Sequence, residues 1–347
     1  GVQAALDRLE GPDDRAKEAR WEVCVESVTR ALPALTDLLF IGKYYSVESK
    51  RIGEELTQRI KAAFLTEIAD LPWLDGPTRK RALAKATKMQ LNIGAPQSYS
   101  FVRYPVSNSS FLANALLSLR AKMVTQMWKV DRPADRTEWE FPANTVNAWY
   151  DNSLNAMYVP AGILQPPFFA SKFPAAQNFG GIGSIVGHEM THGFDTKGSR
   201  FDEESRRVDW WSPDVRQDFW ARSECIADLY SKQRVANASV DGYFTLGENI
   251  ADLGGMRLSL AAFLLWHREI HQSEAPDAKK RTFFVAYAQL WCADYTPAEQ
   301  RQLLRTDVHS PKALRANLVP SQDARFAEAF QCPRGSPMNP PTRCSLW

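Results

Sequence analysis

The sequence has no apolar run long enough to cross a membrane. Its most conspicuous apolar stretch, Leu258 to Trp266, is interrupted by Ser259 and is far shorter than a bilayer-spanning helix requires. No signal peptide is recognisable either, and the chain begins at Gly1, so we expect a processed or excised part of a longer polypeptide. A membrane segment is therefore not expected within this chain.

An excess of charge of one sign is also missing. The 42 Lys and Arg residues nearly balance the 40 Asp and Glu residues, which leaves a formal net charge of +2. Because basic residues are scattered among acidic ones without forming a stripe, nucleic acid is not an expected partner. The hydrophobic content of 44% and the charged content of 24% are those of an ordinary globular protein with ample core.

Cysteine is scarce, and the number of five is odd, so at least one thiol is free or bonded to another chain. Cys332 and Cys344 lie in a tail rich in Pro, Gly and Ser, which has little apolar content and which disulfides would hold down in a secreted protein. Glycosylation sequons at Asn108 and Asn237 agree with secretion, although two matches in a chain of 347 residues are close to chance. These features favour an oxidising, extracellular location.

Histidine is equally scarce, yet two of the five histidines stand four residues apart, at His188 and His192. If this segment is helical, both imidazoles project from one face and can bind one metal ion. Glu189 lies slightly round the same helix, where a carboxylate reaches a water molecule at the metal instead of the metal itself. The alternative is that both histidines are ordinary core or helix-surface residues.

A catalytic zinc site needs a third protein ligand. One class of sites places a Gly three residues and a His six residues after the second histidine, but those positions hold Asp195 and Gly198. Glu248 and Asp252, one turn apart on a later helix, offer a carboxylate ligand and an acceptor for the second N–H of a ligating imidazole. Without the histidines, these two acids would be interpreted as surface residues.

Two other clusters are interpreted as surface features. His267 and His271 are also four residues apart, but Glu269 between them is rotated by about 200 degrees from His267 on a helix, and the segment is polar. The second cluster is a basic helix over residues 77–89, whose cations we expect to form a solvated face. These cations are Arg79, Lys80, Arg81, Lys85 and Lys88.

Apolar spacings of three and four predict a mostly helical chain, with helices over much of residues 1–90, 111–128 and 213–235. Residues 141–160 instead alternate around a polar turn at Asp151-Asn152-Ser153, which predicts a β-hairpin. The edge of this hairpin either holds an extended peptide through its free backbone groups or pairs with another strand.

Six ordered motifs resemble those of the neprilysin and endothelin-converting-enzyme family of zinc metallopeptidases, over about Trp21 to the last residue. They are NAWY at 147–150, PAGILQPPFF at 160–169, GHEMTHGFD at 187–195, GENIAD at 247–252, TDVHSP at 306–311 and CSLW at 344–347. The resemblance is to the C-terminal, catalytic half of the family. It implies a mainly α fold with a small β-sheet, a thermolysin-like zincin domain with additional helices from a second lobe. Residues 1–90 would form a helical segment shared with or linking to that lobe, and 91–347 the catalytic domain.

The resemblance also implies roles for individual residues. His188, His192 and Glu248 would bind one Zn²⁺ ion, with Glu189 as general base and Asp252 supporting a ligand. His309, oriented by Asp307, would stabilise the oxyanion. Asn147, Ala148 and Arg315 would hold the substrate backbone, and Ile163, Phe168, Ile185 and Trp291 would line a pocket for a large apolar side chain. Ser184 stands where relatives often have a bulkier apolar residue.

The expected function is hydrolysis of short extracellular peptides on the amino side of bulky hydrophobic residues by a zinc endopeptidase. The alternative is an inactive relative that serves as a binding or scaffold ectodomain; a structural zinc site, closed by four protein ligands, would need no general base.

The resemblance further implies a Cys225–Cys344 disulfide. We expect the N-terminal half of the same precursor either as a separate chain, for which Cys24, Cys292 and Cys332 are candidate disulfide partners, or as a segment that has been removed. The protein would be secreted or at the extracellular face of a membrane, with any anchor outside this chain.

Overall fold

The computed structural model describes residues 19–99, 101 and 103–347, which divide into two compact units. The smaller unit contains the described residues up to Leu39 together with Ser98–Pro133, and the larger contains Phe40–Gln97 and Ala134–Trp347. Helix α3 (Pro33–Tyr44) crosses this division. The domain boundary expected at residue 90 stays a prediction.

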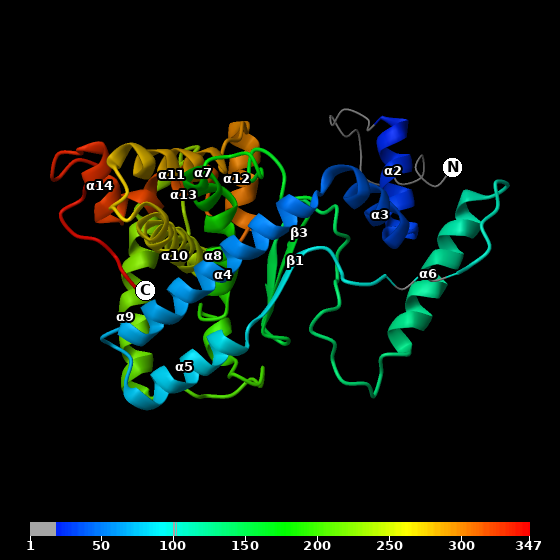
Figure 1. Ribbon diagram of the computed structural model, residues 1–347, viewed down its shortest axis with the longest axis horizontal. Coiled ribbons are helices and arrows are strands. Elements are labelled where there is room, and N and C mark those ends of the chain that lie inside the picture. The colour runs from blue at the N-terminus through cyan, green and yellow to red at the C-terminus, as the bar shows by residue number, and fades with distance from the viewer. Residues whose placement is uncertain (1–18, 100, 102) are drawn as a thin grey trace. The chain divides into compact units, whose positions relative to one another are not determined.

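The smaller unit consists mainly of α2 (Arg20–Ala31), the first part of α3 and α6 (Phe111–Met127) (Figure 1). Neither α2 nor α6 contains a buried residue. Large apolar side chains of both helices, including Trp21, Phe111 and Leu119, are instead exposed. The described part of this unit therefore has apolar surface without an apolar core to bury it.

The larger unit is a helical domain with a small sheet, as the sequence predicted (Figure 1). Helices α7, η1 and α8 follow one another directly in the sequence, and the π-helical turn η1 contains a kink at Gly181, whose ψ of −109° is not helical. Within the described residues, no helix is both long and apolar enough to span a bilayer. The elements are α4 (Val47–Asp70), α5 (Gly76–Lys88), β1 (Gln90–Gly94), β2 (Trp149–Asp151), β3 (Ala156–Pro160), α7 (Ala175–Asn178), η1 (Phe179–Gly183), α8 (Ser184–His192), η2 (Gly198–Arg200), α9 (Pro213–Ser231), β4 (Arg234–Val235), β5 (Ala238–Ser239), α10 (Leu246–His271), α11 (Asp277–Gln289), α12 (Pro297–Thr306), α13 (Lys312–Ser321) and α14 (Ala324–Phe330).

The predicted hairpin is present as β2 and β3, which are antiparallel. Strand β1 pairs with β3 in parallel, so the strand order is β1-β3-β2 and β2 lies at one edge of this sheet. All five residues of β3 are buried, as a central strand requires. Among the described strands, β2 therefore has a partner on one side only, and it lies against α8.

Helices α8 and α10 pack with unusually close backbones because two glycines face each other. A Cβ atom built on Gly187 of α8 would lie 2.5 Å from the carbonyl oxygen of Gly255 on α10. One built on Gly255 would lie 2.6 Å from the carbonyl oxygen of Ser184. This contact brings the face of α8 that carries His188 against the start of α10.

A methyl group at position 255 should therefore destabilise the protein, although alanine is the better helix former. We expect Gly255→Ala to lower the free energy of unfolding by about 2 kcal/mol through overpacking. Gly42→Ala is the matched control, because nothing lies within 4 Å of a Cβ there, and it should be neutral or stabilising by about 0.5–1 kcal/mol. Urea unfolding of both variants measures the difference, and an equal effect would contradict the close-packing argument.

Cys225 of α9 forms a disulfide with Cys344, which confirms the pairing implied by the resemblance. The tail is also held by burial of its last residues, Leu346 and Trp347, and by the Trp73 indole, which donates to the Leu346 carbonyl at 3.0 Å. The tail thus has more apolar anchoring than its composition indicated.

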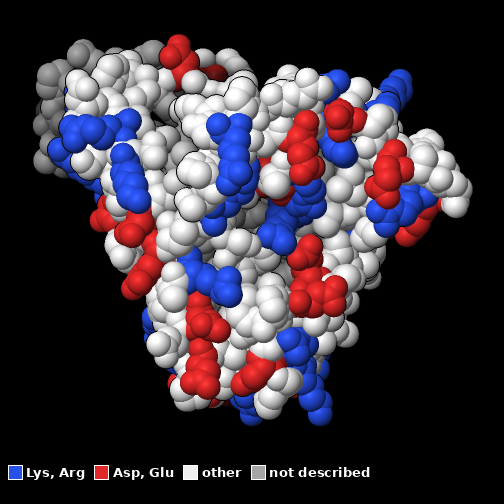
Figure 2. Space-filling model, turned by 90° about the vertical axis from the view of Figure 1, so that its left-hand side faces the viewer, with Lys and Arg blue, Asp and Glu red and all other residues white. Residues whose placement is uncertain are grey.

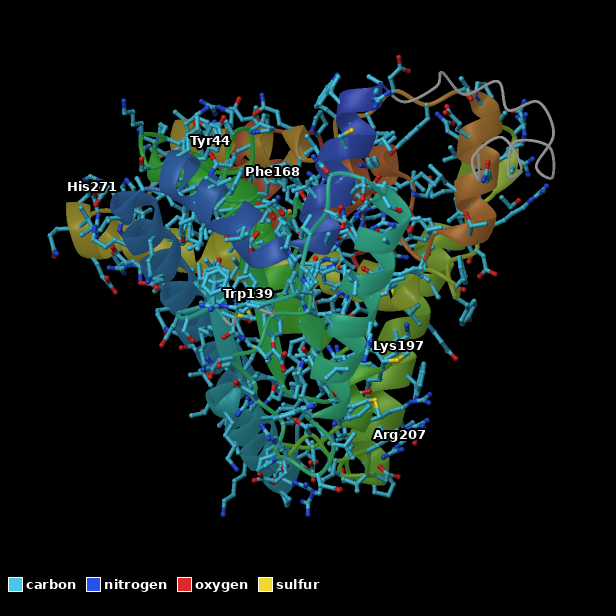
Figure 3. All side chains as sticks on the ribbon, turned by 90° about the vertical axis from the view of Figure 1, so that its right-hand side faces the viewer. Tyr44, Trp139, Phe168, Lys197, Arg207 and His271 are labelled. Carbon is cyan, nitrogen blue, oxygen red and sulfur yellow. A yellow bond between two sulfur atoms is a disulfide. The ribbon has the colours of Figure 1, made fainter. Side chains whose placement is uncertain are left out.

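Two expectations about surface residues are wrong in part. His267 is only 7% exposed because it packs against Phe263 of the same helix, and its Nδ1 lies 3.2 Å from the carbonyl oxygen of Ser273, just beyond the helix end. His271 is exposed at the outer end of α10 (Figure 3). Within the basic helix, Lys85 is fully buried instead of solvated. On the face shown in Figure 2, basic and acidic side chains are interleaved, and neither sign covers a large area.

Candidate active site

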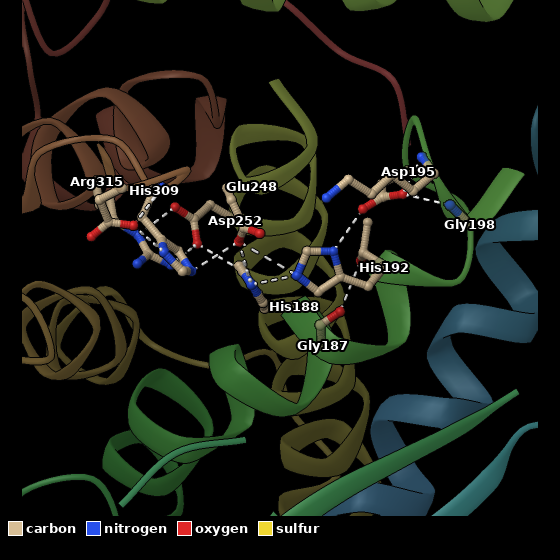
Figure 4. Close-up of polar contacts among 12 residues, drawn as sticks. Gly187, His188, His192, Asp195, Gly198, Glu248, Asp252, His309 and Arg315 are labelled. Atoms are coloured by element: carbon tan, nitrogen blue, oxygen red, sulfur yellow. Dashed lines mark hydrogen bonds and ion pairs between the residues drawn. The ribbon is translucent and has the colours of Figure 1, made fainter. Parts of the chain in front are cut away.

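Helices α8 and α10 bring three potential metal ligands together (Figure 4). The Nε2 atoms of His188 and His192 are 2.9 Å apart. Glu248 Oε2, from the first turn of α10, lies 3.2 Å from the first of these nitrogens and 3.4 Å from the second. Tetrahedral zinc ligands bonded at about 2.0–2.1 Å would be about 3.4 Å apart, so this spacing fits a zinc ion.

Each imidazole is oriented by a carboxylate on its other nitrogen. His188 Nδ1 is 2.8 Å from Asp252 Oδ1, and His192 Nδ1 is 2.7 Å from Asp195 Oδ2. Burial favours a neutral Asp252, but Arg315 and His188 lower its pKa to about 2, so it is an anionic acceptor. The Nδ1 atoms therefore donate to carboxylates, and the Nε2 lone pairs point at one another and at Glu248.

A set of converging lone pairs needs positive charge at its centre, either as protons or as a metal ion. Burial opposes protonation of His192, yet Asp195 and Glu248 raise its pKa well above the ordinary value. Burial likewise favours a neutral Glu248, but the surrounding imidazoles lower its pKa. Glu248 Oε2 is buried and has no well-formed hydrogen bond within the described protein. Two nitrogens and one anionic oxygen are a donor set that suits Zn²⁺.

Glu189 lies beside this set without belonging to it. The side chain follows His188 on α8, is 5% exposed and lines the same cavity as the ligands. Burial raises its pKa, while the neighbouring His188 and His192 oppose that shift. A carboxyl group with a raised pKa next to a metal position is suited to accept and return a proton.

His309 reaches the site from the loop between α12 and α13. Its Nε2 is 3.0 Å from Glu248 Oε2, and its Nδ1 is 2.8 Å from Asp307 Oδ1. The next residue, Ser310, donates its hydroxyl to Asn249 Oδ1 of α10 at 2.6 Å, and both are buried. This hydrogen bond fixes the histidine loop to the helix that supplies Glu248.

Arg315 is more enclosed than a substrate-binding residue needs to be. Its Nε and Nη2 donate to Asp252 Oδ2 and Oδ1, both at 2.7 Å, and its guanidinium lies 3.7 Å from the centre of the Trp291 ring. Arg315 therefore holds the carboxylate that orients His188. The two N–H groups of Nη1 and the second one of Nη2 are left to meet a substrate carbonyl, and that role stays a prediction.

The predicted residues surround one cavity of about 950 Å³. Ala148 and the exposed Asn147 directly precede β2 and line this cavity. Ser184 also lines the cavity, but its hydroxyl donates back to the Gly180 carbonyl at 3.0 Å and presents little polarity. The apolar residues predicted for a side-chain pocket, Ile163, Phe168, Ile185 and Trp291, all line this cavity.

Sequence reasoning missed several residues that support the site. Asp195 was considered only as a position where a different class of site would have glycine, although a carboxylate three residues after a ligating histidine is within reach of that histidine. The Asn249–Ser310 hydrogen bond joins residues far apart in the sequence, and no local pattern indicates it.

Two histidines four residues apart on one helix, with a glutamate supplied by the helix packed against it, define the zincin class of metallopeptidases. Two sequence profiles of peptidase family M13 match the chain, one over residues 147–346 and the other over residues 3–96. The chain belongs to this family, the neprilysin and endothelin-converting-enzyme family of zinc metallopeptidases that its motifs predicted.

Curated relatives agree with this membership. Membrane metallo-endopeptidase-like 1 of Mus musculus is 36% identical in an alignment 350 residues long, which covers 95% of this chain and 46% of the relative. Neprilysin-1 of Caenorhabditis elegans is 36% identical over 96% of this chain and 46% of its own length. Endothelin-converting enzyme-like 1 of Homo sapiens is 35% identical over 98% of this chain and 45% of its own length. The chain thus spans about half the length of the curated relatives it matches.

Solved structures show the same fold. The crystal structure of Mycobacterium tuberculosis zinc metalloprotease Zmp1 with an inhibitor matches with a TM-score of 0.88 and 30% identity, over 95% of this chain and 51% of that chain. PepO from Lactobacillus rhamnosis HN001 matches with a TM-score of 0.80 and 28% identity, over 88% of this chain and 48% of that chain.

Proposed function

We propose that this chain forms the catalytic part of a zinc-dependent endopeptidase. The proposal rests on the convergence of His188 Nε2, His192 Nε2 and Glu248 Oε2 within 3.4 Å, with Glu189 beside them. These three side chains would hold one zinc ion and leave a position open for the reaction, as catalytic zinc sites do. Membership of the family supports the assignment.

A zinc ion held there supplies a Lewis acid that polarises a peptide carbonyl and makes water more acidic. Glu189 accepts the proton of the attacking water and returns it to the departing amine. Although burial opposes the charge on His309, Glu248 and Asp307 raise its pKa, so the ring can donate from Nε2 while Asp307 holds Nδ1. A donor in that position stabilises an oxyanion as negative charge develops on the substrate.

The cavity supports an extended peptide with a bulky apolar residue just after the scissile bond. Ala148, directly before the edge strand β2, lines the cavity, and its backbone groups would bind a peptide of any sequence. Asn147 and Arg315 would hold the carbonyls on the leaving-group side. The apolar wall of the cavity would enclose the large side chain, with Ser184 leaving room for it.

Removal of the Ser310 hydroxyl should loosen the histidine loop. We expect Ser310→Ala to lower kcat by about tenfold with little change in KM, less than the loss of about 10²–10³ typical when an oxyanion donor itself is removed. Ser321→Ala is the matched control, because that buried hydroxyl donates to the Leu318 carbonyl and accepts from the Gln322 side chain, away from the histidine loop. Steady-state kinetics on a quenched peptide measure both, and a change in KM alone would argue against this role.

Peptide cleavage with and without metal tests the proposed function. The purified protein should cut a quenched peptide on the amino side of Phe or Leu, lose this activity with a chelator, and regain it with added Zn²⁺. Mass spectrometry of the products locates the cut. An inactive scaffold would bind zinc without turnover, and cleavage that survives complete zinc removal would exclude the proposed chemistry.

We further propose that the N-terminal half of the same precursor accompanies this chain outside the cell. The exposed apolar side chains on α2 and α6 and the unpaired Cys24, Cys292 and Cys332 support a further polypeptide segment, and the Cys225–Cys344 disulfide supports an oxidising compartment. Protein from its natural source should run as a larger species on a non-reducing gel, and reduction should separate this chain from a second one. The same single band under both conditions, at the mass of this chain, would contradict the partner.

A further inference from the structure

Lys85 on α5 is the most completely buried cation of the described chain, with 0% exposure. Its Nζ donates to the backbone carbonyls of Gly193, Gly198 and Phe201 at 2.6, 2.7 and 2.7 Å. Burial lowers the pKa of Lys85 to about 7, but three acceptors need three N–H donors, and only the ammonium form has them. A buried charge is costly unless all its donors are used, and here all of them are.

The three carbonyls belong to the turn that follows the second histidine of the candidate zinc site. Gly193 comes directly after His192, and Gly198 and Phe201 lie at the far side of the turn. Between them, Asp195 Oδ1 accepts from the backbone N–H groups of Lys197 and Gly198, both at 2.7 Å, and its Oδ2 bonds His192 Nδ1 at 2.7 Å. The ammonium therefore ties both ends of the turn that directs Asp195 at the imidazole.

Lys85 is itself held in place from the sheet. Its carbonyl accepts from the side-chain amide of Asn155 at 3.0 Å, and the Asn155 side chain also accepts from the Tyr150 hydroxyl at 2.8 Å. Asn155 lies at the start of β3 and Tyr150 in β2. One residue of α5 thus connects the hairpin on one side of the cavity to the metal-binding turn on the other.

We propose that Lys85 is a positioning residue for zinc binding, acting through the 193–201 turn and Asp195 on His192. The inference rests on the proposed zinc site and adds a residue outside the cavity to it. Lys88, one turn further along α5, is exposed and pairs only with Glu204 at the surface. Lys88 is the same residue type in the same helix as Lys85 but lacks its buried contacts. Lys88→Met is therefore the matched control.

The test is zinc affinity, measured by competition with a chromogenic chelator on the whole protein, including any segment beyond this chain. We expect Lys85→Met to weaken zinc binding by about tenfold, at the lower end of the range for partners of ligating histidines, and Lys88→Met to leave it unchanged. In an Asp195→Asn background, Lys85→Met should weaken binding by less than about twofold, because the route to His192 is already broken. The d–d absorption of the cobalt-loaded protein should shift in Lys85→Met and should stay unchanged in Lys88→Met.

A purely structural role predicts a different pattern. In that case the melting temperatures of the zinc-free and zinc-loaded proteins fall equally while the zinc dissociation constant is unchanged, and the inference is overturned. A tenfold loss in both backgrounds would also overturn it, because Lys85 would then act independently of Asp195. If Lys85→Met does not fold, Lys85→Gln, which is close in size and keeps a polar end, takes its place in the same comparison. Failure of the wild type to bind zinc would instead remove the proposed function, and this inference with it.

Discussion

Glu189→Gln should lower kcat by about 10³-fold while the protein keeps its zinc. The amide has nearly the shape of the carboxyl group but cannot accept a proton, and general base catalysis contributes about 10²–10⁴-fold to such reactions. Zinc content should be unchanged because Glu189 lies outside the set of His188, His192 and Glu248. Turnover of a quenched peptide and metal analysis of the same sample measure both quantities.

Glu224→Gln is the control for this substitution. Glu224 is exposed on α9 and does not line the cavity of the candidate site, so kcat should stay within about twofold of the wild type, as for most surface substitutions. A Glu189→Gln protein that keeps more than a third of its activity would remove Glu189 from the mechanism. Loss of zinc together with activity would make it a ligand or a structural residue.

Glu248→Ala should weaken zinc binding by about 10³-fold or more, because it removes one of three ligands and the only anionic one. Asp252→Asn provides a graded comparison. Asp252 touches the imidazole of His188 instead of the metal position, so its loss should weaken zinc binding by only about 10–100-fold. Chelator competition measures both affinities.

Comparison of the two losses of zinc affinity distinguishes a metal ligand from a residue that supports a ligand. If Asp252→Asn weakened zinc binding as much as Glu248→Ala, the division between ligand and supporting residue would be wrong. Circular dichroism of both zinc-free proteins should match that of the wild type, since alanine is compatible with α10 and asparagine keeps the shape of aspartate. Loss of the native circular dichroism spectrum in either variant would show that the weaker zinc binding results from unfolding.

The candidate metal ligands could be picked out from the sequence because helical periodicity determines which side chains share a face. His188 and His192 are one turn apart on α8, and Glu248 and Asp252 are one turn apart on α10. What periodicity cannot give is the approach of the two helices. That depends on Gly187 meeting Gly255, a contact between positions far apart in the chain.

Lys85 shows where reasoning from local pattern fails. Lys85 lies in a helix with several other cations, among them Arg79 and Lys88, so the pattern indicated a solvated face. Nothing in the sequence distinguished Lys85 from these other cations. Burial of this lysine depends on three backbone carbonyls more than 100 positions later. Such carbonyl groups are present in any sequence, and only the tertiary fold determines where they gather.

Arg315 marks a different limit. Its predicted contact with a substrate carbonyl came from the resemblance, whereas the structure adds a bidentate interaction with Asp252. One residue can serve both purposes only through the N–H groups of its guanidinium that do not bond Asp252. Truncation of Arg315 would therefore disturb the orientation of His188 as well as substrate binding. The zinc affinity of such a variant should be measured together with its kinetics.

The location of the metal tests the central claim most directly. Crystals of the zinc-loaded protein, measured on both sides of the zinc absorption edge, should give one anomalous peak between His188 Nε2, His192 Nε2 and Glu248 Oε2, with Glu189 close by but not bonded to the metal. A peak elsewhere in the protein, or a zinc ion closed off by four protein ligands, would contradict a catalytic site at this position.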